Sequence, residues 1–199
     1  MDFFNTIAQA GEAEYNDRGS KFLAYAFPIA DAAEFKKRLT ALKKEHPKAA
    51  HFCFAYRLRI DGNNFRVTDD GEPTGSAGKP ILGQIDSREV VDLAIVVVRY
   101  FGGTLLGVPG LINAYKMAAL LVLQVVPIVQ KPVLINYSIQ FDYTQMHEVM
   151  VIVKQLNCVV LAQENQLFSL IKLGVPKNRK GELLYKLENL RNVEVAQLL

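Results

Sequence analysis

The sequence predicts an α+β fold in two domains, one over residues 1–129 and one over residues 132–199. Short segments that alternate apolar and polar residues indicate half-buried strands, and between them lie segments with the three- and four-residue apolar spacing of helices. In the first domain, strands precede a glycine-rich loop and a long apolar helix, whereas strands and helices interchange in the second. Pro127 and Pro132 stand on either side of the expected boundary.

The composition is that of a folded globular protein. Half of the 199 residues are hydrophobic, 22% are charged, and the formal net charge is +3. So small a positive excess gives little support to nucleic-acid binding by the molecule as a whole, and leaves local clusters as the place to look for it. Cys53 and Cys158 each lie in an apolar strand-like run, which predicts reduced thiols in a cytoplasmic protein. We expect no cofactor.

No segment of the chain indicates contact with a membrane. Residues 1–19 lack the basic segment followed by an apolar run that marks a signal peptide. The longest apolar stretch, residues 117–129, is interrupted by Gln124 and Pro127 and is too short to cross a bilayer.

The first elements predicted are a strand over residues 20–29 and a helix from Asp31 to about His46. Asp31 suits the N-cap position, and Phe35, Leu39 and Leu42 follow at core spacing. The other faces of this helix carry four lysines: Lys36, Lys37, Lys43 and Lys44. A solvated face is the favoured interpretation of these lysines, and a stripe that contacts phosphates is the alternative.

The segment from 51 to 60 reads HFCFAYRLRI and predicts the next strand. Its large apolar residues, at every second position from Phe52 to Ile60, fall on one face, which we expect to be the core side. The less apolar face carries His51, Cys53, Ala55, Arg57 and Arg59. A turn at 61–62 and a strand over 65–68 then predict a hairpin.

Residues 69–80, DDGEPTGSAGKP, form a polar glycine-rich loop before a helix over about 81–88, with Pro80 at its first position. A nucleotide-binding P-loop is excluded, because Pro73 and Pro80 stand where that motif needs a glycine and a hydroxyl residue. A looser anion site is open, and a tight, well-capped connection is the alternative. The anion site would use Gly75, Ser76, Gly78 and Lys79.

The three acidic residues of this loop, Asp69, Asp70 and Glu72, are hard oxygen ligands of the kind that bind Mg²⁺ or Ca²⁺. Their spacing is not that of an EF-hand, so no metal site is predicted. The favoured roles are pairing with Arg57 or Arg99 and capping of nearby backbone.

A buried strand over 91–98 ends at Arg99-Tyr100-Phe101, and an apolar helix begins near Leu111. Between them the glycines recur at Gly102, Gly103, Gly107 and Gly110. Their spacing is not that of a dinucleotide fingerprint, so they are expected to permit unusual backbone angles and close packing; a ligand cradle is left open. Arg99 is expected either to contact phosphate beside aromatic rings that stack on bases, or to be buried against Asp69 or Asp70 with Phe101 in the core.

His51 and Cys53 raise the question of a nucleophile and its base. They share a strand face but stand about 6.6–6.8 Å apart along the axis, and no third orienting group is evident. A structural or hydrogen-bonding role for His51 is favoured.

The second domain repeats strands and helices in the order β-α-β-β-α-β, which is the ferredoxin-like split unit. The predicted elements are a strand over 133–141, a helix from about Thr144, strands over 158–163 and 167–175 around a turn at 164–166, a helix over 180–190 and a strand over 193–198. A basic loop at 176–181 is interpreted as solvated, with an RNA contact as the alternative.

The motifs DDGEPTGSAGKP and RYFGGTLLGVPGL, with HFCFAYR upstream, resemble the IMPACT/YigZ family. This resemblance implies a first domain like domain IV of elongation factor G and a second like its domain V. It also implies a role in translation, because eukaryotic IMPACT proteins regulate translation by binding the activator of a stress-responsive kinase. Two basic positions that many members carry near the glycine loop are Leu105 and Asn113 in this chain.

The leading hypothesis is a translation-associated regulatory protein that binds RNA or a ribosome-linked partner, with no catalytic residue assigned. One alternative is an enzyme for a small phosphorylated or anionic substrate at loops 69–80 and 99–110, and another is a protein-interaction module with an exposed apolar patch. The predicted binding residues are His51, Arg57, Asp69, Asp70, Glu72, Gly75, Ser76, Gly78, Lys79, Arg99, Tyr100, Phe101, Gly102, Gly103, Gly107 and Gly110.

Overall fold

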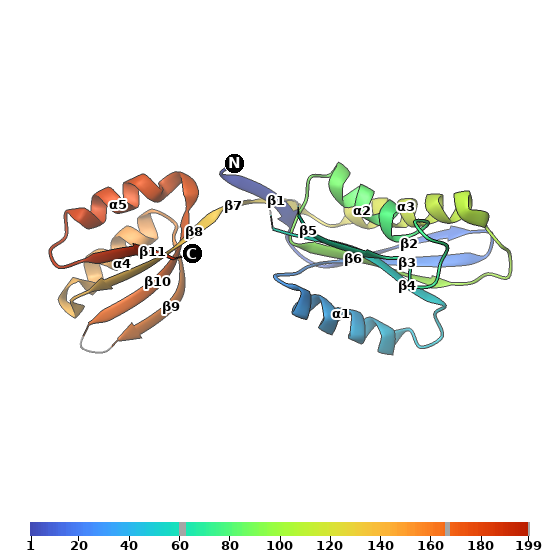
Figure 1. The fold of residues 1–199 in the computed structure, drawn as a ribbon, viewed down its shortest axis with the longest axis horizontal. Helices are drawn as coiled ribbons and strands as arrows, with labels where there is room; N and C mark the ends of the chain where they lie inside the picture. The colour runs from blue at the N-terminus through green and yellow to red at the C-terminus, as the bar shows by residue number, and fades with distance from the viewer. Residues whose placement is uncertain (60–62, 166–167, 199) are drawn as a thin grey trace. The chain divides into compact units, whose positions relative to one another are not determined.

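A computed structural model describes residues 1–59, 63–165 and 168–198 of the chain. The chain divides into two compact units (Figure 1). One unit is Phe4–Gln130, and the other is Lys131–Leu199 together with Met1–Phe3. Ile60 and the predicted turn at 61–62 lie outside the described residues, as does part of the turn predicted at 164–166.

The N-terminal unit is built on an antiparallel sheet with the strand order β2-β3-β6-β4-β5. A separate two-stranded sheet pairs β1 with β7. Two strands therefore precede the segment from residue 20 that was expected to be the first, and β7 adds one more after the long helix. The bounds are β1 Phe3–Ile7, β2 Gly11–Asp17, β3 Ser20–Pro28, α1 Ala32–Glu45, β4 His51–Leu58, β5 Asn64–Thr68, α2 Gly78–Ser87, β6 Leu93–Tyr100, α3 Gly107–Val125 and β7 Ile128–Pro132.

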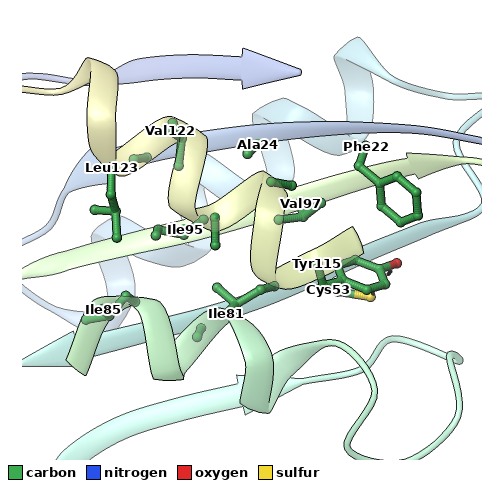
Figure 2. Close-up of a cluster of buried hydrophobic side chains, with 14 of the residues drawn as sticks. Phe22, Ala24, Cys53, Ile81, Ile85, Ile95, Val97, Tyr115, Val122 and Leu123 are labelled. Atoms are coloured by element: carbon green, nitrogen blue, oxygen red, sulfur yellow. Dashed lines mark hydrogen bonds between the residues drawn. The ribbon is translucent and has the colours of Figure 1, made fainter. Parts of the chain in front are cut away.

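Helices cover both faces of this sheet, α1 on one side and α2 with α3 on the other (Figure 1). Strand β4 consequently has two buried faces rather than the single core face predicted. Phe52 and Phe54 belong to the core under α1. Cys53 and Ala55 belong to the core under α2 and α3, where Figure 2 shows side chains of both helices meeting the sheet.

The first residues of the helices can be explained by N-capping and by the unpaired N–H groups of a first helical turn. Asp31 is the N-cap of α1, as predicted, and its carboxylate accepts a 2.8 Å hydrogen bond from the Glu34 N–H. Helix α2 begins at Gly78 rather than at Pro80. Proline is tolerated there because the first N–H groups of a helix have no intrahelical acceptor. Helix α3 likewise begins four residues before the predicted Leu111, at Gly107.

Helix α3 is 19 residues long and, by length and composition alone, long and apolar enough to cross a membrane. The prediction of a stretch too short to span a bilayer therefore underestimated this helix. One face of α3 is part of the core of the N-terminal unit, which accounts for its apolar character. The buried residues are Leu111, Ala114, Tyr115, Ala118, Ala119, Val122 and Leu123.

The C-terminal unit has the strand order β11-β8-β10-β9. Numbered within the unit, this is the order 4-1-3-2 of a β-α-β-β-α-β chain, so the predicted ferredoxin-like arrangement and the α+β class are confirmed. The helices α4 and α5 pack on the sheet through one apolar core. The bounds are β8 Leu134–Phe141, η1 Tyr143–Gln145, α4 Met146–Gln155, β9 Val159–Asn165, β10 Ser169–Pro176, η2 Lys177–Arg179, α5 Lys180–Glu188 and β11 Glu194–Gln197.

Gly102 marks the closest backbone approach in the N-terminal unit. A Cβ atom at this position would overlap the Gly19 carbonyl group and the Ser20 nitrogen. We expect Gly102→Ala to lower the free energy of unfolding by roughly 1–3 kcal/mol, because backbone has to move to admit the methyl group. Urea unfolding followed by circular dichroism measures this change.

Gly83→Ala in α2 is the matched control, because a Cβ there meets no atom within 4 Å. Alanine in a helix interior should stabilise by up to about 1 kcal/mol. Equal unfolding midpoints for the two variants would contradict the close approach at Gly102.

Candidate functional site

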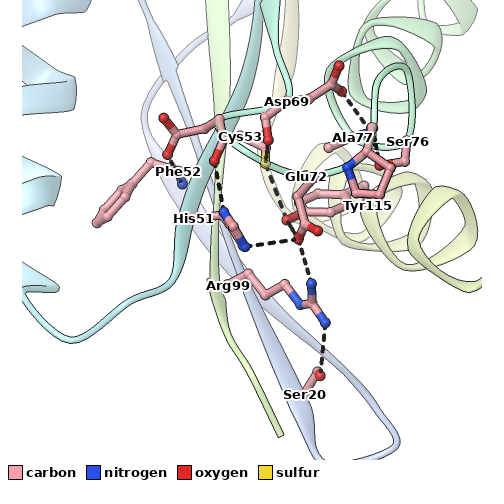
Figure 3. Close-up of polar contacts among 12 residues, drawn as sticks. Ser20, His51, Phe52, Cys53, Asp69, Glu72, Ser76, Ala77, Arg99 and Tyr115 are labelled. Carbon is pink, nitrogen blue, oxygen red and sulfur yellow. Dashed lines mark hydrogen bonds and ion pairs between the residues drawn. The ribbon is translucent and has the colours of Figure 1, made fainter. Parts of the chain in front are cut away.

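Four segments meet at one end of the sheet, on the side covered by α2 and α3 (Figure 3). They are the start of β4, the end of β6, the loop 69–77 that leads into α2, and the middle of α3. His51 in β4 is paired in register with Arg99 in β6, and Arg99 is paired with Phe22 in β3. Side chains on one face of adjacent strands lie next to each other, so the sheet register places His51 and Arg99 side by side.

A buried ion pair joins the 69–77 loop to the end of β6, just before the second glycine-containing loop. An η nitrogen of Arg99 donates to Glu72 Oε1 at 2.6 Å, and the two side chains are 6% and 4% exposed. The Tyr115 hydroxyl donates to the same carboxylate oxygen at 2.7 Å. The prediction that Arg99 pairs with an acidic residue of the 69–80 loop is confirmed, although its partner is Glu72 and not Asp69 or Asp70.

The surroundings of Arg99 leave its guanidinium closed to an external phosphate. Its second η nitrogen lies 3.5 Å from Ser20 Oγ, and its guanidinium carbon lies over the rings of Phe22 and Phe101, 5.4 and 5.6 Å from their centroids. Phe101 is 51% exposed, not in the core as one interpretation had it. The phosphate contact proposed for Arg99 is therefore not supported.

Tyr100 lies on the opposite face of the sheet from this cluster. Its hydroxyl is 3.0 Å from His46 Nδ1, and it packs against the core under α1. Alternation along β6 makes this unavoidable, because neighbouring residues of a strand face opposite ways. Tyr100 is removed from the predicted site.

Asp69 occupies the backbone donors that were predicted to bind an anion. Its carboxylate accepts from the Gly75 and Gly78 N–H groups at 2.8 Å each and from the Ala77 N–H at 3.0 Å. Partial burial acts to raise the pKa of Asp69, but these backbone hydrogen bonds outweigh it and hold the pKa below its ordinary value. The loop is thus the tight, capped connection. The Asp69 carboxylate binds the N–H groups that an external anion would have needed.

The remaining loop residues fit the same description. Ser76 is fully buried, and its hydroxyl donates to the Pro73 carbonyl at 2.6 Å. Lys79 is exposed in the first turn of α2. Gly78 allows α2 to approach β5, because a Cβ there would lie 2.9 Å from both the nitrogen and the oxygen of Thr68.

His51 and Asp70 hold the loop against β4. Asp70 Oδ2 accepts from the Phe52 N–H at 2.7 Å, and the Asp70 carbonyl lies 2.8 Å from His51 Nδ1. A carbonyl can only accept, so Nδ1 carries a proton and Nε2 faces Glu72, 4.0 Å from Oε1. His51 therefore has the hydrogen-bonding role that the sequence favoured, and it is a quarter exposed.

The environment of Cys53 does not suit a nucleophile. Its thiol donates to the Asp69 carbonyl at 2.9 Å, and its sulfur lies 3.2 Å from the Tyr115 hydroxyl oxygen. Burial raises the pKa of Cys53 strongly and also raises that of Tyr115. Since the thiolate is the reactive form, this cysteine is held as an inert thiol. Cys53 and Cys158 are both free cysteines.

Tyr115 and Ser20 belong to the cluster, and sequence reasoning missed both. Tyr115 is fully buried on an otherwise apolar face of α3, and a lone hydroxyl on such a face is the signal that would have found it. Ser20 is fully buried at the start of β3 and accepts from the Gly102 N–H at 3.2 Å. Nothing in its sequence context distinguishes it from an ordinary turn residue.

Arg57 lies outside the cluster. It stands six residues along β4 from His51, which corresponds to roughly 20 Å. Its ε nitrogen donates to Asp86 in α2 at 2.8 Å, and its guanidinium lies over the Phe65 ring. The shared strand face was predicted correctly, but the shared site was not.

The glycines of the 102–110 segment serve the backbone, as expected. Gly103 and Gly107 have φ values of +86° and +71°, in the left-handed region that favours glycine. A Cβ on Gly110 would lie 3.0 Å from Leu106 Cβ.

The acidic residues of the loop bind protein groups of their own. Asp69 and Asp70 accept from backbone N–H groups, and Glu72 accepts from Arg99 and Tyr115. Within residues 1–59, 63–165 and 168–198, no three His, Cys, Asp or Glu side chains are grouped so that they could hold a metal ion.

Fold and site together define a two-unit α+β protein whose first unit fixes two glycine-containing loops around a buried arginine–glutamate pair. Residues 18–123 match the model of the Impact N-terminal domain. The chain is 33% identical over 154 residues to the IMPACT family member YigZ of Escherichia coli, a match that covers 76% of each chain. The chain belongs to the IMPACT family.

Other relatives agree with this assignment. IMPACT family member YvyE of Bacillus subtilis is 34% identical over 139 residues, or 70% of this chain and 64% of that relative. Protein IMPACT of Xenopus laevis is 35% identical over 97 residues, which cover 46% of this chain and 30% of that protein. A crystal structure described as that of a hypothetical protein superposes with a TM-score of 0.81 at 27% identity, over 100% of this chain and 98% of that one.

The Arg99–Glu72 pair should be destabilising to break and tolerable to remove as a whole. We expect Glu72→Leu or Arg99→Met alone to lower the free energy of unfolding by about 3–5 kcal/mol, because each leaves a buried charge without its partner. The double variant should be more stable than either single variant. Urea unfolding of all four proteins measures the coupling, and additive losses would contradict it.

Asp69 should contribute stability that depends on pH. Its folded-state pKa lies below the ordinary 3.8, so its contribution is fully present above about pH 4 and is lost as the pH falls further. Asp69→Asn should therefore be less stable than the wild type at pH 7, and the difference should shrink between about pH 4 and pH 2. Thermal unfolding across this range measures it, and a difference independent of pH would refute the assignment.

Proposed function

We propose that this chain is a translation-associated regulatory protein that acts in the cytoplasm by binding RNA or a ribosome-linked partner. Membership of the IMPACT family supports the link to translation, which the family resemblance implies. One observation supports binding over catalysis: the charged side chains where the two loops meet are already hydrogen-bonded to backbone or side-chain groups of the protein. Asp69, Asp70 and Glu72, the acid–base groups that an enzyme would need, accept hydrogen bonds from the protein itself.

The surface of the 101–106 loop suits a protein partner better than a phosphate. Arg99 is buried beneath it, whereas Phe101 and Leu105 are 51% and 82% exposed. Val108 and Ile112 extend the exposed apolar surface into the first turns of α3. Exposed apolar side chains on a loop with a rigid support are typical of an interaction site. We assign this surface to a protein component linked to the ribosome.

Sedimentation with purified ribosomes tests this function. The wild-type chain should comigrate with ribosomal particles in a sucrose gradient, and Leu105→Asp/Val108→Asp should comigrate at least about tenfold less. Both positions are exposed, and an aspartate in the first turn of α3 favours the helix, so the variant should fold.

Leu161→Asp/Tyr185→Asp is the matched control, because it replaces two exposed residues of the C-terminal unit. The control should comigrate like the wild type. A wild-type chain that stays at the top of the gradient at low salt would refute the proposed function, and comigration of the loop variant would refute the assigned surface.

A further inference from the structure

The positive charge of the chain is concentrated in one segment. Residues 31–48, which are α1 and its flanks, contain six Lys or Arg and three Asp or Glu. The net charge of this segment therefore equals the +3 of the whole chain, and the remaining residues balance. A weak overall charge can thus coexist with a strong local field.

The charges on α1 are also sorted by face. At about 100° per residue, Lys36, Lys37, Lys43 and Lys44 fall within a sector of about 120°. Phe35 and Leu42, on the opposite side, are buried in the core. The acidic residues Glu34 and Glu45 fall next to Arg38, outside the lysine sector. The lysine face of α1, meaning Lys36, Lys37, Lys43 and Lys44 with Lys48 just beyond the helix, carries no carboxylate of its own.

Because the acidic residues of α1 lie outside the lysine face, only some of the cations of this helix have a partner. Arg38 lies 4.0 Å from Glu34 and over the Phe27 ring, and Lys43 lies over the Phe52 ring. Lys36, Lys37, Lys44 and Lys48 are exposed, and no carboxylate in the described part of the chain lies within ion-pair distance of them. Such ammonium groups stay hydrated and are available to an external anion.

We propose that the lysine face of α1 is the surface through which this protein contacts RNA phosphates. The inference rests on the proposed function and moves its RNA contact from the glycine-containing loops to the other face of the sheet (Figure 1). The 14 residues of α1 span about 21 Å, the length of about six phosphates of one strand.

The chemistry of the face defines the kind of RNA contact. Lysines are flexible point charges that bind phosphate without reading base edges. Between the lysines the sector presents Thr40 and offers no exposed aromatic ring for stacking on bases. We therefore expect binding with little sequence preference and a steep dependence on salt.

Fluorescence anisotropy with a labelled 20-nucleotide single-stranded RNA of mixed sequence tests the inference. The test variant is the full chain with Lys36→Gln/Lys37→Gln/Lys44→Gln. Glutamine is also a good helix former, so these substitutions should leave α1 intact. We expect binding at least about tenfold weaker than wild type, with the slope of log affinity against log salt reduced by about two for three lost contacts.

Arg66→Gln/Lys116→Gln/Lys172→Gln is the control, because it removes the same charge from exposed positions outside α1. Equal losses in the two triple variants, or no loss in either, would overturn the inference. A wild-type chain that comigrates with ribosomes but does not bind this RNA would overturn the inference and leave the proposed function standing. Failure in both assays would overturn both.

Discussion

The buried pair between Arg99 and Glu72 is the interaction on which the N-terminal unit depends at the end of the sheet that carries the candidate site. Removing two charges from water is costly, and the arrangement offsets this cost with further contacts. One oxygen of Glu72 accepts from Arg99 and Tyr115 together, and aromatic rings lie against the guanidinium. Glu72 lies in the loop before α2 and Arg99 at the end of β6, so the pair ties that loop to the end of the sheet.

A sheet with helices on both faces allows the protein to use its charges in two ways. On the side of α2 and α3, charged groups of the candidate site bind other groups of the protein. Asp69, for example, accepts hydrogen bonds from the backbone N–H groups of its own loop. On the side of α1, Lys36, Lys37, Lys44 and Lys48 are exposed, and no carboxylate of the described residues pairs with them. The face richest in recognisable motifs is therefore a poor place for an external anion, and the plainest helix is the better one.

The sequence revealed those features that depend on neighbouring residues. Asp31 caps α1 through a contact three residues away. The fold of the C-terminal unit could be predicted because each of its strands and helices has its own recognisable apolar spacing. The double burial of β4 escaped prediction because Cys53 and Ala55 are small and did not look like a second core face. The choice of Glu72 over Asp69 and Asp70 depends on loop geometry that periodicity does not encode. The prediction that Arg57 shares a site with His51 was wrong for a related reason. Alternation shows which face of a strand a side chain lies on, but it does not show how close two residues of that face are along the strand.

The pairing of β1 with β7 gives the N-terminal unit an entrance and an exit at neighbouring strands. In sequence, the unit is an insertion: the chain leaves Met1–Phe3, builds Phe4–Gln130, and returns to Lys131. An insertion whose ends lie together can be joined end to end and reopened elsewhere, so this unit is a natural subject for circular permutation. It could also be exchanged between relatives as a cassette, cut at both strands at once.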